Sequence, residues 1–201
     1  MRDAIREVSV ELLLRHGYQG FRFRDVAERL NTTRANVHYY YGSKQNLCEE
    51  VIVDYVEGTI ADWTANWRRQ ADLVAKIGGM MESNRQRYRR ANPTGDTGHA
   101  WSLIGRMRLE RDEIGPRARD VLARFGAVLE RIVTEAVANA VARGELGPET
   151  PVADVAIQIV AVADSAGAIT QDSFSFDRLE RLYGSIARTV LHAYGRPAAR
   201  A

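Results

Sequence analysis

The stretch Phe23–Lys44, FRDVAERLNTTRANVHYYYGSK, decides the fold. Its apolar residues recur at spacings of three and four, which predicts two short helices over about 23–30 and 34–41. Between them stands Asn31, the non-glycine residue that best tolerates the positive φ of a tight turn between helices. Two short helices joined in this way form a helix-turn-helix pattern, which places its second helix across the major groove of DNA.

The ends of the second short helix are also marked. Thr32 and Thr33 offer a hydroxyl that can cap its N-terminus, and Gly42 ends it. Ser43 then caps a long helix that begins at Lys44. A cation is unfavourable at a helix N-terminus, whereas the free N–H groups there bind anions well. A phosphate between Lys44 and these N–H groups would explain the lysine; the alternative is a solvated side chain.

Three consecutive tyrosines close the second helix. Successive helical positions turn by about 100°, so Tyr39, Tyr40 and Tyr41 span about 200° and a short helix cannot bury all three. Tyr41 lies four residues after Val37 and suits the core face. We expect Tyr39 and Tyr40 to point outward, where phenol groups can contact phosphates, sugars or bases. The alternative is that they lie half-buried against the first helix.

The composition of the chain limits the possible classes of protein. Of its 201 residues, 45% are hydrophobic and 27% charged, which is enough to bury a core. The net charge of +2 does not by itself indicate a DNA-binding protein. The window Arg22–Lys44, however, carries five basic and two acidic residues, a local charge of +3. No long apolar run or signal peptide is recognised, so we expect a cytoplasmic protein.

Several segments resemble the N-terminal domain of TetR-family transcriptional regulators. They are Gly17–Gly20 (GYQG), Phe23–Arg29 (FRDVAER) and Thr33–Lys44 (TRANVHYYYGSK). The resemblance covers about residues 5–52, and its most specific part is the tyrosine-rich helix end followed by Ser43, Lys44 and Leu47. Asn31 stands in place of the usual turn glycine, His38 where tyrosine is common and Gly42 where proline is common.

The resemblance implies which residues contact DNA. Thr33, Tyr40 and Lys44 correspond to positions that contact phosphates. Arg24 corresponds to a position that reaches a base in some members, and the amide of Asn36 suits bidentate recognition of adenine. By the same resemblance, the base-facing side of the recognition helix is formed by Arg34, Ala35, Asn36, His38 and Tyr39.

Beyond this region the pattern predicts further helices, and alternation typical of strands is nearly absent. The expected helices are 3–15, 23–30, 34–41, 44–69, 73–91, 101–112, 116–143, 151–171 and 176–194. The predicted fold is therefore all-α, with nine helices in two domains. We expect a three-helix helix-turn-helix domain over 1–45, a helical ligand-binding and dimerisation domain over 46–196, and a disordered tail over 197–201.

Family members bind a small effector among the middle helices, and aromatic and methionine side chains at helical spacing suit such a pocket. Asn84 interrupts an apolar stripe and needs a partner, which a ligand could supply. Asp164 could orient an effector or belong to a buried network at a subunit contact. Core packing is the alternative for each residue. The expected effector-binding residues are Trp63, Trp67, Met81, Asn84, Tyr88, Trp101, Ile104, Met107 and Asp164.

The last two helices favour self-association, because their small residues let helices approach closely. We predict a four-helix bundle with a second copy, which would place two recognition helices about 34–36 Å apart, one turn of DNA. The expected interface residues are Ala156, Ile159, Ala163, Leu179, Leu182, Tyr183, Ile186 and Val190.

The predicted function is a ligand-responsive DNA-binding regulator, a repressor that binds a palindromic operator as a homodimer and is released by a small, largely apolar effector. Its expected partners are double-stranded DNA, the effector and a second copy, with no membrane, cofactor or metal. No common catalytic motif is present, so an enzyme is not expected. The alternative is an all-α binding protein or enzyme that uses its pocket without regulating DNA. Cys48 is expected to be a packing residue, and a redox sensor is the alternative.

Overall fold

A computed structural model describes residues 1–95 and 97–196. Over these residues the chain is helical, and one isolated β-bridge pairs Leu146 with Gly195. The helices are α1 (Arg2–Gly20), α2 (Phe23–Arg29), α3 (Arg34–Tyr41), α4 (Lys44–Arg68), α5 (Leu73–Ala91), α6 (Leu103–Leu109), α7 (Pro116–Ala142), α8 (Val152–Ser173) and α9 (Asp177–Tyr194). The predicted all-α fold is confirmed, while the predicted tail over 197–201 lies outside the described residues.

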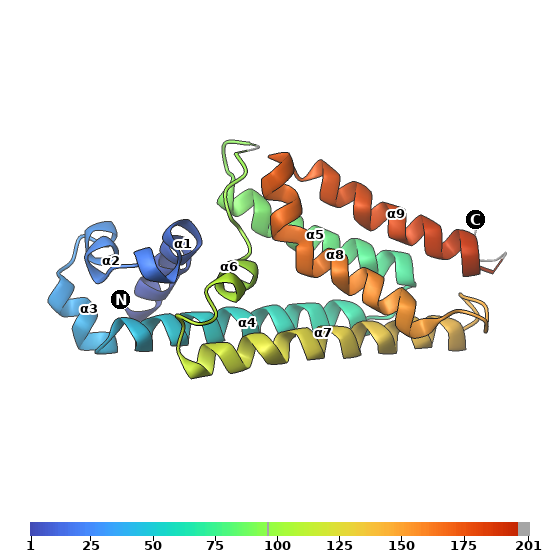
Figure 1. Ribbon diagram of the computed structural model, residues 1–201, viewed down its shortest axis with the longest axis horizontal. Helices are drawn as coiled ribbons and strands as arrows, with labels where there is room; N and C mark the ends of the chain where they lie inside the picture. Colours follow the sequence, from blue (N-terminus) through green and yellow to red (C-terminus); the bar gives the residue numbers. More distant parts are fainter. Residues whose placement is uncertain (96, 197–201) are drawn as a thin grey trace.

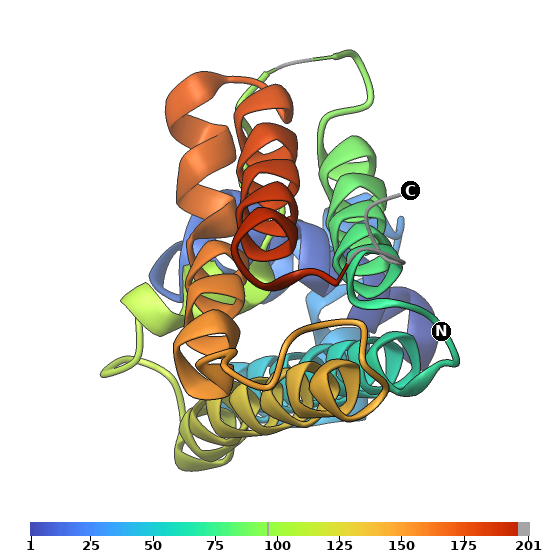
Figure 2. The ribbon, with the colours of Figure 1, turned by 90° about the vertical axis from the view of Figure 1, so that its right-hand side faces the viewer.

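The helices form two domains that share α4. Figure 1 shows α1, α2 and α3 gathered at one end of the molecule, around the start of α4. The helix α4 then continues into the second domain, where it packs along α7. Seen along the molecule in Figure 2, α8 and α9 pack together above this pair, and α5 packs on α9. The short helix α6 lies between the two domains and contacts α1.

The caps predicted around α3 are confirmed. Thr33 Oγ1 accepts a hydrogen bond from the N–H of Asn36 (3.1 Å), and Ser43 Oγ accepts one from the N–H of Asn46 (3.1 Å). Asn31 adopts the positive φ expected of it, 48°, and Gly42 ends α3 with a φ of 69°. Local side-chain and backbone preferences therefore fix both ends of this helix.

Several helix ends differ from the predictions. The helix α1 extends to Gly20 because the chain returns to helical geometry after an interruption at Gly17, whose φ is 68°. The helix α6 is shorter than predicted at both ends: it begins at Leu103, where Ser102 Oγ caps it by accepting from the N–H of Gly105 (3.1 Å), and it ends at Leu109. The last helix begins at Asp177 rather than next to Ser175.

A buried carboxylate joins the two longest helices. Glu49 of α4 is 6% exposed, and its Oε1 accepts a hydrogen bond from the N–H of Arg117 (3.0 Å) in the first turn of α7. The free N–H groups and dipole of a helix N-terminus stabilise a negative charge there. Gly115 allows the close approach, because a Cβ atom at that position would lie 2.0 Å from Glu49 Oε1.

The helices α8 and α9 bury most of the residues predicted for the dimer interface, which corrects that prediction. Leu182 and Ile186 are partly exposed. The other six are buried inside the subunit: Ala156, Ile159, Ala163, Leu179, Tyr183 and Val190. Their apolar spacing therefore marks the face that packs on neighbouring helices of the same chain.

The outer face of α8 is also rich in small and apolar residues. It exposes Ala153, Ile157, Ala161 and Ala168, and Ile157 is 48% exposed. By length and composition α8 resembles a membrane-spanning segment, with a mean hydropathy of 1.6. Only 28% of that apolar window is buried inside the subunit, so α8 retains an uncovered apolar surface.

Candidate DNA-binding surface and ligand pocket

The helix α3 turns its tyrosines to different sides. Val37 and Tyr41 are buried, as predicted, and Tyr39 is 83% exposed. Tyr40 is partly buried, and its ring stands edge-on to that of Tyr39 with the ring centres 5.5 Å apart. One side of α3 therefore anchors the helix, while Tyr39 projects fully from the molecule and Tyr40 only in part.

The polar side of α3 is partly engaged within the chain. Asn36 Nδ2 donates a hydrogen bond to Thr32 Oγ1 (2.9 Å), which orients the amide and still leaves its second hydrogen and its oxygen for a base. His38 Nδ1 lies 3.0 Å from the carbonyl oxygen of Gly42. The His38 ring packs edge-on against the ring of Phe23, with the ring centres 4.6 Å apart. His38 is therefore held against α2, and Nε2 is its remaining polar atom.

The cations at this end of the molecule are also positioned. Lys44 Nζ donates to the carbonyl oxygen of Gln19 (3.2 Å) and lies 4.6 Å from the centre of the Tyr18 ring. An ammonium group has three hydrogens, so this contact leaves donors for a phosphate. Arg24, on the exposed start of α2, pairs with Glu28 at 2.7 Å.

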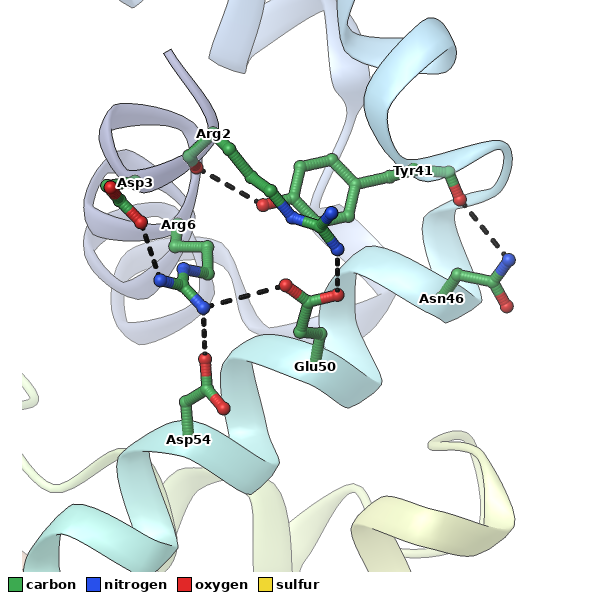
Figure 3. A network of polar contacts seen from close by, with 7 residues as sticks. All are labelled: Arg2, Asp3, Arg6, Tyr41, Asn46, Glu50 and Asp54. Carbon is green, nitrogen blue, oxygen red and sulfur yellow. Dashed lines mark hydrogen bonds and ion pairs between the residues drawn. The ribbon is translucent and has the colours of Figure 1, made fainter.

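A polar network that the sequence did not reveal fastens α1 and α3 to α4 (Figure 3). Arg6 lies 2.7 Å from Asp54 and 2.6 Å from Asp3, and Arg2 lies 2.8 Å from Glu50. The seven residues drawn are Arg2, Asp3, Arg6, Tyr41, Asn46, Glu50 and Asp54. The Tyr41 hydroxyl donates to the carbonyl oxygen of Arg2 in α1, and Asn46 Nδ2 of α4 donates to the carbonyl oxygen of Tyr41, so the end of α3 is fastened to both helices.

Cys48 of α4 lies in the hydrophobic core. Its side chain is buried, and burial raises the pKa of its thiol to about 12. The thiol therefore stays protonated at neutral pH, whereas a reactive redox cysteine needs an accessible thiolate. These observations support the packing role expected for Cys48.

A small cavity lies among α4, α5, α6, α7 and α8. Its free volume is about 20 Å³, room for a single water. Its lining is Tyr55, Thr59, Trp63, Asn84, Arg87, Trp101, Ser102, Ile104, Gly105, Arg108, Phe125, Ala163 and Asp164. Five of the nine predicted effector-binding residues line it: Trp63, Asn84, Trp101, Ile104 and Asp164.

The other four predicted effector residues do not line the cavity. Trp67, Tyr88 and Met107 are buried in the core, and Met81 is partly buried. Helical spacing placed them on apolar faces correctly, but those faces meet other helices rather than the cavity. Core packing, the alternative given above, is the better description of these four.

The buried polar groups around the cavity differ in their partners. Asn84 Nδ2 donates to Tyr183 Oη (3.0 Å), and Trp101 Nε1 donates to Thr170 Oγ1 (2.7 Å). Asn84 thus has a partner within the chain and does not require a ligand. In contrast, Trp63 Nε1 is buried with no acceptor among the described residues. An unpaired buried N–H is costly, so this indole is the group with most to gain from a ligand.

Two arginines of the cavity lining lie over the rings of Trp63 and Phe125. Arg87 pairs with Asp62 (3.2 Å) and lies 5.9 Å from the centre of the Trp63 ring. Arg108 pairs with Asp164 (2.7 Å) and lies 5.5 Å from the centre of the Phe125 ring. Asp164 is partly exposed and ion-paired, rather than part of a buried network.

Comparisons with known proteins give a consistent result. Residues 5–51 match the family model of bacterial regulatory proteins, tetR family. No match was found among curated proteins.

Similar solved structures cover nearly the whole chain. A TetR transcriptional regulator from Legionella pneumophila has 18% identity and a TM-score of 0.75, covering 94% of this chain and 97% of its own. One from Chloroflexus aurantiacus has 20% identity and a TM-score of 0.75, covering 97% and 99%. A Saccharomonospora viridis protein in complex with choline has 18% identity and a TM-score of 0.72, covering 97% of each chain. At these identities the likeness establishes the fold.

Proposed function

We propose that this chain, whose residues 5–51 match the family model of bacterial regulatory proteins, tetR family, is a TetR-family repressor that binds a palindromic operator as a homodimer. A small, largely apolar effector releases it from DNA. The observation that carries the proposal is the exposed side of α3, with Tyr39 projecting, beside the start of α4 with Lys44. The fold and the family match point to a transcription factor rather than an enzyme.

The DNA contacts divide into two kinds. Lys44, Thr33 and Tyr40 bind phosphates, which gives affinity without sequence preference. Arg24, Arg34, Ala35, Asn36, His38 and Tyr39 lie toward the bases. The amide of Asn36, oriented by Thr32, supports reading of an adenine.

This division is tested with fluorescence anisotropy on the upstream region of the protein's own gene and on random DNA. Lys44→Ala should weaken binding to both DNAs and lower the slope of log affinity against log salt by about 1. Asn36→Ala should cost about 1–3 kcal/mol at one base pair of the specific site and little on random DNA. Equal effects of both substitutions on both DNAs would refute the division of roles.

Dimerisation through α8 and α9 places the two recognition helices about one DNA turn apart. The apolar outer face of α8, with Ile157 exposed, supports this contact better than the buried residues predicted from the sequence. Analytical ultracentrifugation should show a dimer at micromolar concentration, and Ile157→Arg should shift it toward monomer. A strict monomer of the unmodified chain would contradict the proposal.

The effector binds at the cavity beside Trp63. The unpaired indole N–H and the guanidinium groups of Arg87 and Arg108 favour a ligand with an apolar body and an acceptor oxygen. A cationic ligand such as choline is less well matched, because guanidinium groups already cover the faces of Trp63 and Phe125. The small free volume means that side chains move when the effector enters.

Release from DNA follows from the shared helix α4. It carries Trp63 at the cavity and begins at Lys44, so a shift at one end alters the other. A coupling of about 1–3 kcal/mol would change DNA affinity about 5- to 150-fold. The test is a thermal-shift screen for ligands, followed by anisotropy with each hit. A hit that stabilises the protein through Trp63 without changing DNA affinity would refute the coupling.

A further inference from the structure

A second and larger cleft lies between the two domains. Its volume is about 680 Å³, within the range of small-molecule sites. Residues of α1 and α2 line it on the side of the DNA-binding domain, and residues of α5, α6, α8 and the segment before α6 line it on the other side. The charged residues of its described lining are Glu11, Arg15, Arg29, Arg90 and Arg106.

The cleft is strongly basic. Its described lining contains four arginines and a single acidic residue, Glu11. Arg29 pairs with Glu11 at 2.7 Å, and Arg106 pairs with Glu110 at 2.9 Å. Arg15 and Arg90 have no ion-pair partner among the described residues. The unpaired positive charge therefore comes from both domains, one arginine from α1 and one from α5.

Like charges that line one cleft from two domains disfavour its closure, and an anion between them removes that repulsion. Guanidinium groups match phosphate oxygens with paired hydrogen bonds, which makes arginine the usual residue for phosphate recognition. The cleft is also partly apolar, with Leu14 and Pro93 in its lining. A ligand of this size can therefore combine phosphate groups with an apolar portion.

We propose that this interdomain cleft binds a small molecule that carries two or more phosphate groups, held by Arg15 from the DNA-binding domain and Arg90 from the second domain. The site is separate from the effector cavity, with which it shares no lining residue. A ligand held by both arginines ties the two domains together.

The cleft adjoins a contact that already connects the domains. Arg106 in its wall pairs with Glu110, and a Glu110 oxygen accepts a hydrogen bond from the N–H of Tyr18 in α1. An anion near Arg106 competes with Glu110 for the guanidinium group. Binding in the cleft therefore acts on the orientation of α1, and this regulatory consequence rests on the proposed function.

The experiment is isothermal titration of the full chain without DNA, using pyrophosphate and ADP as separate probes in about 0.15 M NaCl. We expect saturable binding of pyrophosphate, and tighter binding of ADP if the apolar part of the cleft contributes. The double variant Arg15→Gln/Arg90→Gln should bind pyrophosphate at least about tenfold more weakly. The matched control is Arg68→Gln/Arg111→Gln, which removes the same charge from exposed arginines outside the cleft. The pyrophosphate affinity of this control should stay within about twofold of that of the unmodified chain, since removing distant screened charges has little effect.

No saturable binding of either probe, or equal weakening by both double variants, would overturn the proposal. So would unchanged pyrophosphate binding by Arg15→Gln/Arg90→Gln, because the two arginines would then not hold the phosphate groups. Circular dichroism of each variant verifies that it folds. Since the titration contains no DNA, its result is independent of whether the chain represses transcription.

Discussion

Glu110 is the residue whose removal most directly tests how α1, α2 and α3 are held against the rest of the chain. It follows the last turn of α6, and its side chain is 18% exposed. One oxygen accepts from the N–H of Tyr18, and the other lies 2.9 Å from Arg106 Nε. The contact lies at the interruption of α1. Gly17 permits it, because a Cβ atom at that position would lie 2.1 Å from Glu110 Oε1.

The expected cost of Glu110→Ala follows from these contacts. The partly buried N–H of Tyr18 loses its acceptor, which costs about 1–3 kcal/mol. The ion pair with Arg106 adds less than about 1 kcal/mol, because the arginine is 35% exposed and screened by solvent. For a chain of this length, a loss of about 2 kcal/mol lowers the Tm by about 4–8 °C. Glu110→Gln keeps an acceptor oxygen and should lose less than half as much.

The assay is thermal unfolding followed by circular dichroism, with each variant at the same protein concentration because self-association shifts the Tm. Glu113→Ala is the control, since Glu113 is exposed and close in sequence. Amide hydrogen exchange gives a second readout, because the N–H of Tyr18 should exchange faster in Glu110→Ala than in the control. If Glu110→Ala melts like the control and the amide of Tyr18 stays protected, this account of the domain contact is refuted.

Two further predictions concern buried groups of α4. Cys48 should resist Ellman's reagent in the folded protein at about pH 8, because burial holds its pKa near 12 and hides the thiol, and it should react after unfolding in guanidinium. Rapid labelling of the folded chain would contradict this. Glu49→Ala should lower the free energy of unfolding by about 1–3 kcal/mol in urea titrations, because the N–H of Arg117 loses its acceptor, and Glu49→Gln should recover part of the loss. An unchanged urea midpoint for Glu49→Ala would show that the contact contributes nothing.

The sequence by itself determined the structure of α3. The ends of α3 follow from Thr33, Asn31 and Gly42, and the opposite directions of Tyr39 and Tyr41 follow from helical geometry. All of these interactions lie within a few residues of one another. Local backbone preferences and the 3.6-residue period are therefore sufficient, and the resemblance to the TetR family rests on the same segment.

Only the tertiary structure decided which partners meet across long stretches of chain. The bond from Arg117 to Glu49 and the bond from Tyr18 to Glu110 join residues 68 and 92 positions apart. The sequence also left open what covers the apolar face of α8 and whether the arginines near the cavity are solvated. The apolar period of a helix shows that one face is buried, but it does not show whether the neighbouring helix belongs to the same subunit. An arginine is expected to be solvated unless tertiary packing places it against an aromatic ring.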